Sequence, residues 1–428
     1  MQGKKLSIGL RTTLLTGALT LYVSTAYAAT EKVLHNFTDN GSDGFNPRAG
    51  LIFDKAGNLY GATVNGGTSD MGTVFELTPK GGGVWTETVL HNFVGGTDGS
   101  FPYGTLIFDA SGNLYGTTQT GGTYGTGTVF EMTHPTKGAW KEKILYNFDA
   151  LNGKDGGTPL DGVIFDGAGN LYGTTEIGGL YDFGTVFELT HKAGGGWKEK
   201  ILHNFNPNTK DGSAPNASLV FDTAGNLYGT TLEGGASGLG TVFELSPKSG
   251  GGWKETLLHS FNSKGKDGYF PFAPVIFDGS GNLYGATSVG GTKFGGTVFE
   301  LSPKTGGGWT EKILYNFGYP GATDPYGKLI FDGSGNLYGT EGANGPDNAG
   351  SVFKLTLQSS GKWTQTVLHN FDVTDGDLPY AGVIFDASGN LYGTTYEGGN
   401  STSCAHPVAG RYSRSNRNAG VRYCWKHG

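Results

Sequence analysis

The sequence predicts an all-β fold, a β-propeller of seven four-stranded blades whose last blade is incomplete, and three observations lead to this prediction. The chain of 428 residues holds 79 Gly, 26 Phe, 21 Tyr and 7 Trp. Glycine for tight turns combined with aromatic side chains for packing is typical of many short strands. Long strings of residues recur in a fixed order along the chain. Each recurring unit contains four strand-like stretches, and propellers have ~4–8 such units.

The clearest recurring string is F-D-x-x-G-N-L-Y-G, whose copies follow one another at a nearly constant spacing. The seven copies begin at Phe53, Phe108, Phe165, Phe221, Phe277, Phe331 and Phe385. In the first unit the expected strands are 51–54, 59–63, 73–78 and 85–93. A turn joins the first two strands, because Asp and Asn bond to nearby amides and Gly adopts positive φ. A β-solenoid is the main alternative, but its coils are usually shorter than this unit.

The two ends of the repeat array predict how the ring closes. One extra copy of the end of a fourth strand, Val33 to Phe37, precedes the first unit. We expect this N-terminal strand to complete the last blade, because an open ring leaves an unpaired strand edge.

The recurring strings also carry a family resemblance. F-D-x-x-G-N-L-Y-G-T-T, then Gly-Gly, then G-T-V-F-E-L resembles the GloVer tandem repeat, over nearly all of residues 30–400. That family is found in exported bacterial proteins with varied C-terminal anchors. The resemblance therefore implies an extracytoplasmic location and surface anchoring, and it implies no reaction.

The N-terminal segment, 1–28, has the pattern of a secretory signal. A basic start is followed by an apolar stretch, 14–23, and Ala26-Tyr27-Ala28 fits the rule for signal cleavage. A membrane anchor is the alternative, but about ten apolar residues are too few to span a bilayer. We expect the segment 1–28 to be removed and the mature chain to be exported to the periplasm, the cell surface or the medium, without a membrane span.

The charge of the chain bears on its partners. The formal net charge is −7, and both ends of the chain are basic, so the repeat region is more acidic still. An acidic surface argues against binding a phosphate backbone. We therefore expect no nucleic-acid partner, and name a glycan, a cation or another surface protein as possible partners.

The C-terminal segment, 401–428, departs from the pattern of the repeat region, 29–400. Where G-T-V-F-E-L should stand, the chain reads Val408 to Arg414 and becomes rich in Arg. Back-translation shows that a neighbouring reading frame can encode the expected string, so a frameshift is expected, and the alternative is a genuine divergent tail. The two cysteines, Cys404 and Cys424, both lie in this tail, so the fold does not depend on disulfides.

Two sets of repeated Asp are the first candidates for chemistry. The Asp of F-D-x-x-G-N is most simply a turn residue. The second set lies between the fourth strand of one unit and the first strand of the next, where a ring of carboxylates at the channel mouth would concentrate cations or amines. These candidate ligand-binding residues are Asp43, Asp98, Asp155, Asp211, Asp267, Asp324 and Asp375. The alternative for them is Asp-Gly turn chemistry.

Other repeated residues are interpreted as structural. His35, for example, stands at a strand position that Tyr146 and Tyr315 occupy in other copies, which argues against metal ligation. The Trp that starts each fourth strand is assigned to packing, although an exposed ring can stack on sugars. We expect no metal, no cofactor and no catalytic residue. The sixth unit departs most, with 341–348 in place of the Gly-Gly loop and Lys354 in place of Glu, so a unique site is sought there.

The preferred function is an exported, non-catalytic binding or scaffold propeller of undefined ligand. The first alternative is a propeller enzyme acting on glycans or lactones, which would need paired carboxylates or a metal cluster at the channel. The second alternative is the truncated product of a frameshifted gene.

Overall fold

A computed structural model describes residues 31–134, 138–318 and 324–399 of the chain. These residues belong to one compact unit, 31–428. The aberrant tail, both cysteines and the expected signal peptide lie outside the described residues. Within them the all-β prediction is confirmed, since the only helical segments are three short 3-10 turns: η1 (Gly96–Asp98), η2 (Ala150–Asn152) and η3 (Pro207–Thr209).

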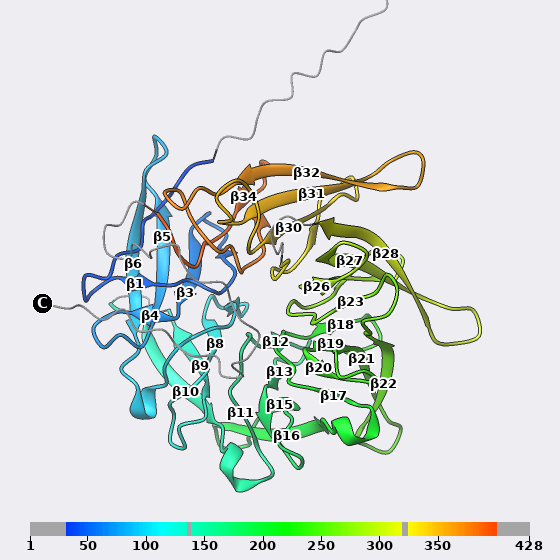
Figure 1. Ribbon diagram of the computed structural model, residues 1–428. Coiled ribbons are helices and arrows are strands. Elements are labelled where there is room, and N and C mark those ends of the chain that lie inside the picture. Colours follow the sequence, from blue (N-terminus) through cyan, green and yellow to red (C-terminus); the bar gives the residue numbers. More distant parts are fainter. Residues whose placement is uncertain (1–30, 135–137, 319–323, 400–428) are drawn as a thin grey trace, which may run out of the picture. The chain divides into compact units, whose positions relative to one another are not determined.

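Six blades of four antiparallel strands are arranged around a common centre (Figure 1); five are separate sheets, and the fifth blade is part of a six-stranded sheet. Their strands run in chain order from the inside of the ring to the outside. The first three blades are β2 (Ile52–Phe53), β3 (Leu59–Thr63), β5 (Thr73–Pro79) and β6 (Trp85–Asn92); β7 (Ile107–Phe108), β8 (Leu114–Thr118), β9 (Thr128–Thr133) and β10 (Lys141–Asn147); β12 (Ile164–Phe165), β13 (Leu171–Thr175), β15 (Thr185–His191) and β16 (Trp197–Asn204).

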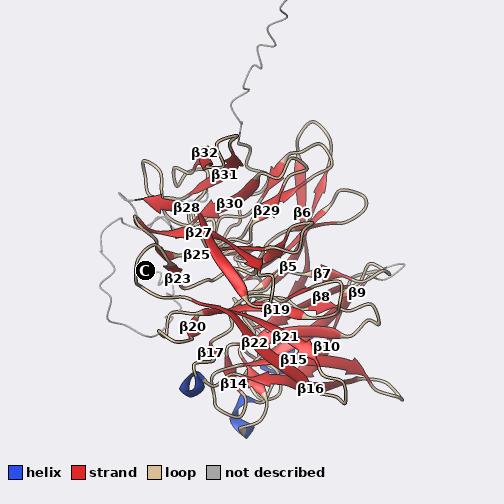
Figure 2. Ribbon diagram, turned by 90° about the vertical axis from the view of Figure 1, so that its right-hand side faces the viewer, coloured by secondary structure: helices blue, strands red, loops and turns tan. Residues whose placement is uncertain are grey.

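The next three blades repeat the same plan, and the side view shows strands throughout (Figure 2). They are β18 (Val220–Phe221), β19 (Leu227–Thr231), β21 (Thr241–Pro247) and β22 (Trp253–Ser260); β24 (Ile276–Phe277), β25 (Leu283–Thr287), β27 (Phe294–Pro303) and β28 (Trp309–Gly318); β29 (Ile330–Phe331), β30 (Leu337–Glu341), β31 (Ser351–Leu357) and β32 (Trp363–Asn370). The seventh repeat contributes a hairpin of β33 (Ile384–Phe385) and β34 (Leu391–Tyr392).

Short two-stranded ladders join the loop that enters a repeat to the Gly-Gly loop of the same repeat. They are β1 (Gly44–Phe45) with β4 (Asn65–Gly66), β11 (Gly156–Gly157) with β14 (Ile177–Gly178), β17 (Gly212–Ser213) with β20 (Glu233–Gly234), and β23 (Gly268–Tyr269) with β26 (Val289–Gly290). These ladders hold the two loops together in the first, third, fourth and fifth repeats.

The Asp of F-D-x-x-G-N organises the first hairpin of each repeat, as predicted. In the fourth repeat, Asp222 Oδ1 accepts hydrogen bonds from the backbone amides of Ala224 and Asn226, at 2.8 and 2.9 Å. Its Oδ2 accepts from the side chains of Asn226, at 2.7 Å, and Tyr228, at 3.1 Å. A carboxylate that accepts four hydrogen bonds fixes the turn geometry, so these residues are structural.

Aromatic side chains form the core between neighbouring blades. Phe243 of β21 is fully buried and packs edge-to-face on Phe205 of the preceding blade, with ring centroids 5.2 Å apart. A Cβ on Gly229 would lie 2.6 Å from Cζ of Phe243. This distance is too short for a contact, so the side chain of Phe243 requires glycine at the facing position of the neighbouring strand. The Trp of each fourth strand packs across the junction too, as Trp253 does on Tyr172 of the preceding blade, which agrees with the packing interpretation.

The ring closes between the first and seventh repeats. Thr394 Oγ1 donates to the carbonyl of Ala49 at 3.2 Å, as Thr230 Oγ1 donates to the carbonyl of Ala273 between two ordinary blades. Phe53 packs edge-to-face on Tyr392 at 5.1 Å between ring centroids. The last junction therefore reproduces the contacts of the others, and the blue and orange ends of the described chain lie side by side (Figure 1).

The predicted closing segment, 33–37, is present at this junction but is not a strand. The third strand of the seventh repeat, with which it was expected to pair, would fall beyond residue 399. Leu34 and Phe37 nevertheless pack on the core shared by the first and seventh repeats. No helix among the described residues is both long and apolar enough to cross a membrane.

Candidate functional site

The predicted Asp ring lies at the junctions between blades, and none of its members is among the residues that line the central cavity. In six of the seven repeats the Asp contacts the His or Tyr near the end of the preceding fourth strand. The pairs are His35–Asp43, His91–Asp98, Tyr146–Asp155, His203–Asp211, His259–Asp267 and His369–Asp375. The structure thus brings the repeated His and Asp together within one repeat.

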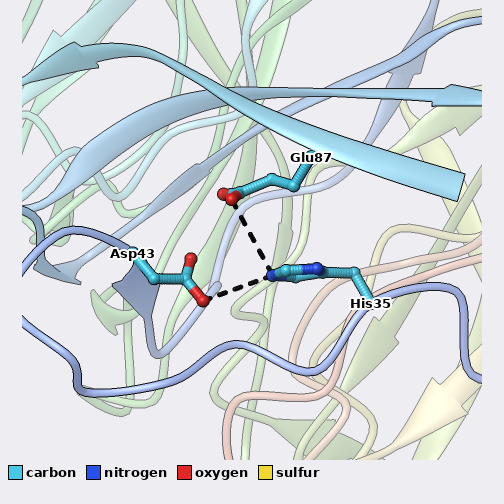
Figure 3. Close-up of side chains that lie close together, drawn as sticks. All are labelled: His35, Asp43 and Glu87. Atoms are coloured by element: carbon cyan, nitrogen blue, oxygen red, sulfur yellow. Dashed lines mark hydrogen bonds and ion pairs between the residues drawn. The ribbon is translucent and has the colours of Figure 1, made fainter.

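A glutamate from the next blade completes the cluster at several junctions. Figure 3 shows Glu87 of β6 facing both His35 and Asp43. His35 Nε2 lies 3.3 Å from Asp43 Oδ2 and 4.0 Å from Glu87 Oε2. In three clusters the His nitrogen and the two carboxylate oxygens all lie within 4.8 Å of one another: His35, Asp43 and Glu87; His203, Asp211 and Glu255; His259, Asp267 and Glu311.

Sequence reasoning missed these glutamates. Each stands two positions after the repeated Trp: Glu87, Glu142, Glu199, Glu255 and Glu311. The position is visible in the repeat, but its partners are on another blade. Only the order of blades and the orientation of the fourth strand place it beside the His and Asp of the preceding repeat.

Burial next to an aspartate raises the pKa of every one of these glutamates. Burial, with Asp155 beside it, raises the pKa of Glu199 from 4.5 to about 9. The pKa is raised to about 8 for Glu255 and to about 7 for Glu87. Burial opposes the charged form of Asp43, but hydrogen bonds from His35 and Thr38 hold its pKa below the usual value. At the first and fourth junctions an Asp with a lowered pKa, Asp43 or Asp211, therefore faces a Glu with a raised pKa, Glu87 or Glu255.

The seventh junction is completed from the other end of the chain. Glu31 precedes His35 by four positions, as Glu87 precedes His91. Burial and the nearby Asp375 raise the pKa of Glu31. Glu31 therefore takes the place that a glutamate of the next blade takes at the other junctions.

The sixth junction departs from the pattern, as the sequence predicted for the sixth unit. Tyr315 donates to Gln365 Oε1 at 3.0 Å, and Gln365 stands where other repeats have Glu. Glu341 is fully buried and accepts hydrogen bonds from Ser351, at 2.5 Å, and Asn344, at 2.6 Å. A cavity of about 510 Å³ opens beside these residues. Asp324 is partly buried, and this burial raises its pKa to about 6.

A second cavity of about 330 Å³ lies on the axis of the ring and is lined by residues from all seven repeats. The position that follows the repeated Pro at the start of each repeat differs from copy to copy. Its occupants all line this cavity: Arg48, Tyr103, Leu160, Asn216, Phe272, Tyr326 and Tyr380. This position stands between a Pro and a strand that both recur, and its residue type changes along the array. The ring therefore presents varied side chains to the cavity on its axis.

The side chains at this position form an aromatic arc with one cation. Ring centroids are 4.7 Å apart for Phe272 and Tyr326, and 5.2 Å apart for Tyr326 and Tyr380. The Arg48 guanidinium carbon lies 4.9 Å from the ring centroid of Tyr103 and 5.5 Å from that of Tyr380. On another part of the wall, Asn216 Oδ1 is buried without a hydrogen-bond partner among the described residues. We call these seven positions the axial site.

Comparison with protein families gives one match. The chain matches the model of the Gloeobacter/Verrucomicrobia repeat over residues 12–208 and 192–405, which agrees with the GloVer resemblance of the repeated strings. No match is found among curated proteins.

Two solved structures are similar to this chain at low sequence identity. An ancestral GH74 enzyme is similar with a TM-score of 0.54 and 14% identity, over 82% of this chain and 47% of that one. An ulvan lyase of polysaccharide lyase family PL25 is similar with a TM-score of 0.49 and 12% identity, over 77% of this chain and 85% of that one. The likeness to the GH74 enzyme supports the propeller fold and nothing beyond it.

Proposed function

This chain belongs to the Gloeobacter/Verrucomicrobia repeat family, and we propose that it is an exported, non-catalytic binding propeller that holds a glycan at the axial site. The observation that carries the proposal is the axial position itself. The Pro before it and the strand that starts four positions after it recur, and the residue that faces the cavity changes along the array. Structural demands are the same in each blade, so this variation is what a site for one particular ligand requires.

The chemistry of the axial site suits a sugar. Tyr and Phe present flat apolar faces, on which the C–H face of a pyranose stacks, together with phenol groups that hydrogen-bond its hydroxyls. Arg48 and the unpartnered Asn216 Oδ1 add a donor and an acceptor. The volume of about 330 Å³ is at the lower end of the ~300–1,000 Å³ usual for small-ligand sites, so the ligand is the end of a glycan.

The acids near the axial site favour binding over catalysis. Glycoside hydrolysis uses two carboxyl groups on either side of the bond. Among the residues that line the axial cavity, the single acid is Asp161. Its oxygens accept hydrogen bonds from the backbone amides of Thr105, at 3.2 Å, and Ser218, at 2.8 Å, so it links three repeats.

Glycan binding is the test. Wild type and the variants Tyr326→Ala and Asn216→Ala are applied to a glycan array, and hits are measured by calorimetry. Both variants are expected to weaken binding at least about tenfold, which corresponds to one lost contact of ~1.4 kcal/mol. Tyr181→Ala is the matched control, because Tyr181 is exposed and does not line the cavity.

Two outcomes would overturn the proposal. If wild type releases products from a bound polysaccharide, and Asp-to-Asn changes at Asp43, Asp98 or Asp155 stop the release, the chain is an enzyme. If the axial variants bind glycans as well as wild type does, the ligand lies elsewhere. The location is tested by fractionating cells and probing the periplasm, surface and medium for the chain.

A further inference from the structure

We propose that three of the blade junctions are binding sites for divalent transition-metal ions of the Zn²⁺ class. The three sites are His35, Asp43 and Glu87; His203, Asp211 and Glu255; His259, Asp267 and Glu311. They are separate from the axial site, none of whose residues takes part, and the proposal does not depend on glycan binding.

The three side chains of each cluster converge as metal ligands do. Each cluster offers one imidazole nitrogen and two carboxylate oxygens within 4.8 Å of one another. In the third cluster His259 Nε2 lies 3.3 Å from Asp267 Oδ2 and 3.5 Å from Glu311 Oε1. Ligand atoms around Zn²⁺ at ~2.0–2.2 Å are separated by similar distances, so small movements suffice. Three protein ligands leave a fourth tetrahedral position for water.

A second observation points to a cation at these sites. Asp43 is 7% exposed and Asp267 is 9% exposed. The Oδ1 atom of each is buried and has no hydrogen-bond partner among the described residues, and the same holds for Oε1 of Glu87. In Figure 3 the carboxyl groups of Asp43 and Glu87 face each other beside His35. His35 faces both carboxyl groups through one nitrogen, but Oδ1 of Asp43 and Oε1 of Glu87 have no donor among the described residues. A further positive charge is therefore needed between the two carboxyl groups, either a metal ion or a proton.

The ligand set selects the class of metal. Imidazole combined with carboxylate suits Zn²⁺ and its first-row neighbours. Ca²⁺ takes ~6–8 oxygen ligands. Each cluster supplies an imidazole and only two carboxylates, so it does not suit Ca²⁺. The His nitrogen that faces the carboxylates is the atom that would bind the ion.

The third junction is a natural comparison. It has the same two acids, Asp155 and Glu199, but Tyr146 in place of His, and the phenol donates to Asp155 Oδ2 at 2.9 Å. A protonated phenol is a poor metal ligand, so a proton supplies the positive charge there. The exchange of His for Tyr, which argued against metal ligation at the sequence level, instead excludes a metal at the junctions that carry Tyr. Among the junctions that carry His, a metal is assigned to the three whose ligand atoms converge within 4.8 Å.

The experiment counts bound metal. The full chain is stripped with a chelator, titrated with Zn²⁺ by calorimetry, desalted and analysed for zinc. Wild type is expected to hold one Zn²⁺ per cluster in the three clusters. The triple variant His35→Tyr, His203→Tyr and His259→Tyr is expected to lose this binding. Tyr is the native residue at two equivalent positions, so the triple variant is expected to fold, which far-UV circular dichroism checks.

A gain-of-site variant makes the test two-sided. Tyr146→His supplies the missing imidazole beside Asp155 and Glu199, so it is expected to bind one Zn²⁺ more than wild type. Zn²⁺ should raise the melting temperature of wild type and not that of the triple variant. The proposal is overturned if wild type holds no Zn²⁺, which leaves protons as the charges at all junctions. It is also overturned if the triple variant retains as much Zn²⁺ as wild type, because binding is then elsewhere.

Discussion

Asn46 donates a hydrogen bond from Nδ2 to the backbone carbonyl of Tyr396, 2.8 Å away and 350 positions later in the chain. This bond joins the first repeat to the seventh at the edge where the ring closes. With the Thr394 to Ala49 bond and the Phe53–Tyr392 packing, it shows that the hairpin of the seventh repeat and the residues after it contact the first repeat and close the ring. The hairpin of the seventh repeat is thus enough to give the first blade a neighbour.

Replacing Asn46 with Ala is expected to lower the free energy of unfolding by about 1 kcal/mol, the usual loss for one intramolecular hydrogen bond. Backbone strain adds little, because Ala214 holds the equivalent position in the fourth repeat at a φ of 53°, against 57° for Asn46. Urea unfolding followed by tryptophan fluorescence measures the change. Thr86→Ala, at an exposed position on β6, is the control. Equal midpoints for wild type and Asn46→Ala would show that this bond does not hold the ring closed.

The turn carboxylates predict that the folded chain becomes less stable in acid. Burial raises the pKa of Asp222, but hydrogen bonds from Asn226 and Ala224 outweigh it, so its pKa lies below 3.8. A carboxyl whose pKa is lower in the folded chain stabilises it above pH ~4 and loses this effect as the pH falls through the folded pKa. Asp222→Ala should lower the free energy of unfolding by roughly 2 kcal/mol at pH 7, because it leaves backbone amides without their acceptor. The difference from wild type should shrink as the pH falls below the unfolded pKa of 3.8.

Thermal melts of wild type and Asp222→Ala from pH 2 to pH 7 measure this effect. Asp347→Ala, at an exposed loop position, is expected to follow wild type throughout. A gap between wild type and Asp222→Ala that stays constant down to pH 2 would mean that the carboxylate charge is not what holds the turn.

The repeat explains why most of the fold was predictable. A string that recurs seven times at a nearly constant spacing predicts the same turn in each repeat. The role of its Asp as a turn residue can therefore be assigned from any one unit, for Asp54 as for Asp222. Contacts between units are a different matter. Glu87 meets His35 and Asp43 only because consecutive blades lie side by side, and no spacing within one repeat encodes this.

The placement of the second Asp set shows the same limit. A ring of carboxylates at the channel mouth assumes that the loops lean toward the axis. Instead, Asp211 is bonded to His203 at 2.9 Å and to the Asn206 amide at 3.0 Å, which holds it at the blade junction. The axial site could have been noticed in the sequence, because the residue type after each repeated Pro changes between repeats, as from Arg48 to Tyr326. Its direction toward the axis required the structure.

The third junction predicts that the folded chain becomes less stable as the pH rises. Burial and Asp155 raise the pKa of Glu199 from 4.5 to about 9, and Tyr146 is the other titratable group that faces it. A carboxyl whose pKa is raised in the folded chain stabilises it fully below the unfolded pKa of 4.5, and this stability is lost as the pH rises toward 9. Glu199→Gln keeps the shape without the charge, so its melting temperature should fall less than that of wild type between pH 5 and pH 9.

Melting curves at half-unit pH steps in the presence of a chelator measure this difference. Glu233→Gln, which alters an exposed glutamate of β20, should leave the pH profile of wild type unchanged. Parallel profiles for wild type and Glu199→Gln would show that Glu199 stays ionised in the folded chain, contrary to the picture of a shared proton at this junction.

The glycine of N-L-Y-G provides the last prediction, because in the seventh repeat no aromatic ring among the described residues faces it. A Cβ on Gly229 would lie 2.6 Å from the Phe243 ring and 2.9 Å from Leu219 Cδ2. At Gly393, in the seventh repeat, the nearest atom among those described is Val383 Cγ1, at 3.1 Å. Gly229→Ala should therefore cost ~1–3 kcal/mol through overpacking, and Gly393→Ala clearly less. Chemical unfolding of the two variants side by side makes the comparison. Equal losses would mean that Gly393 also faces a packed ring, and that the seventh repeat is built like the others.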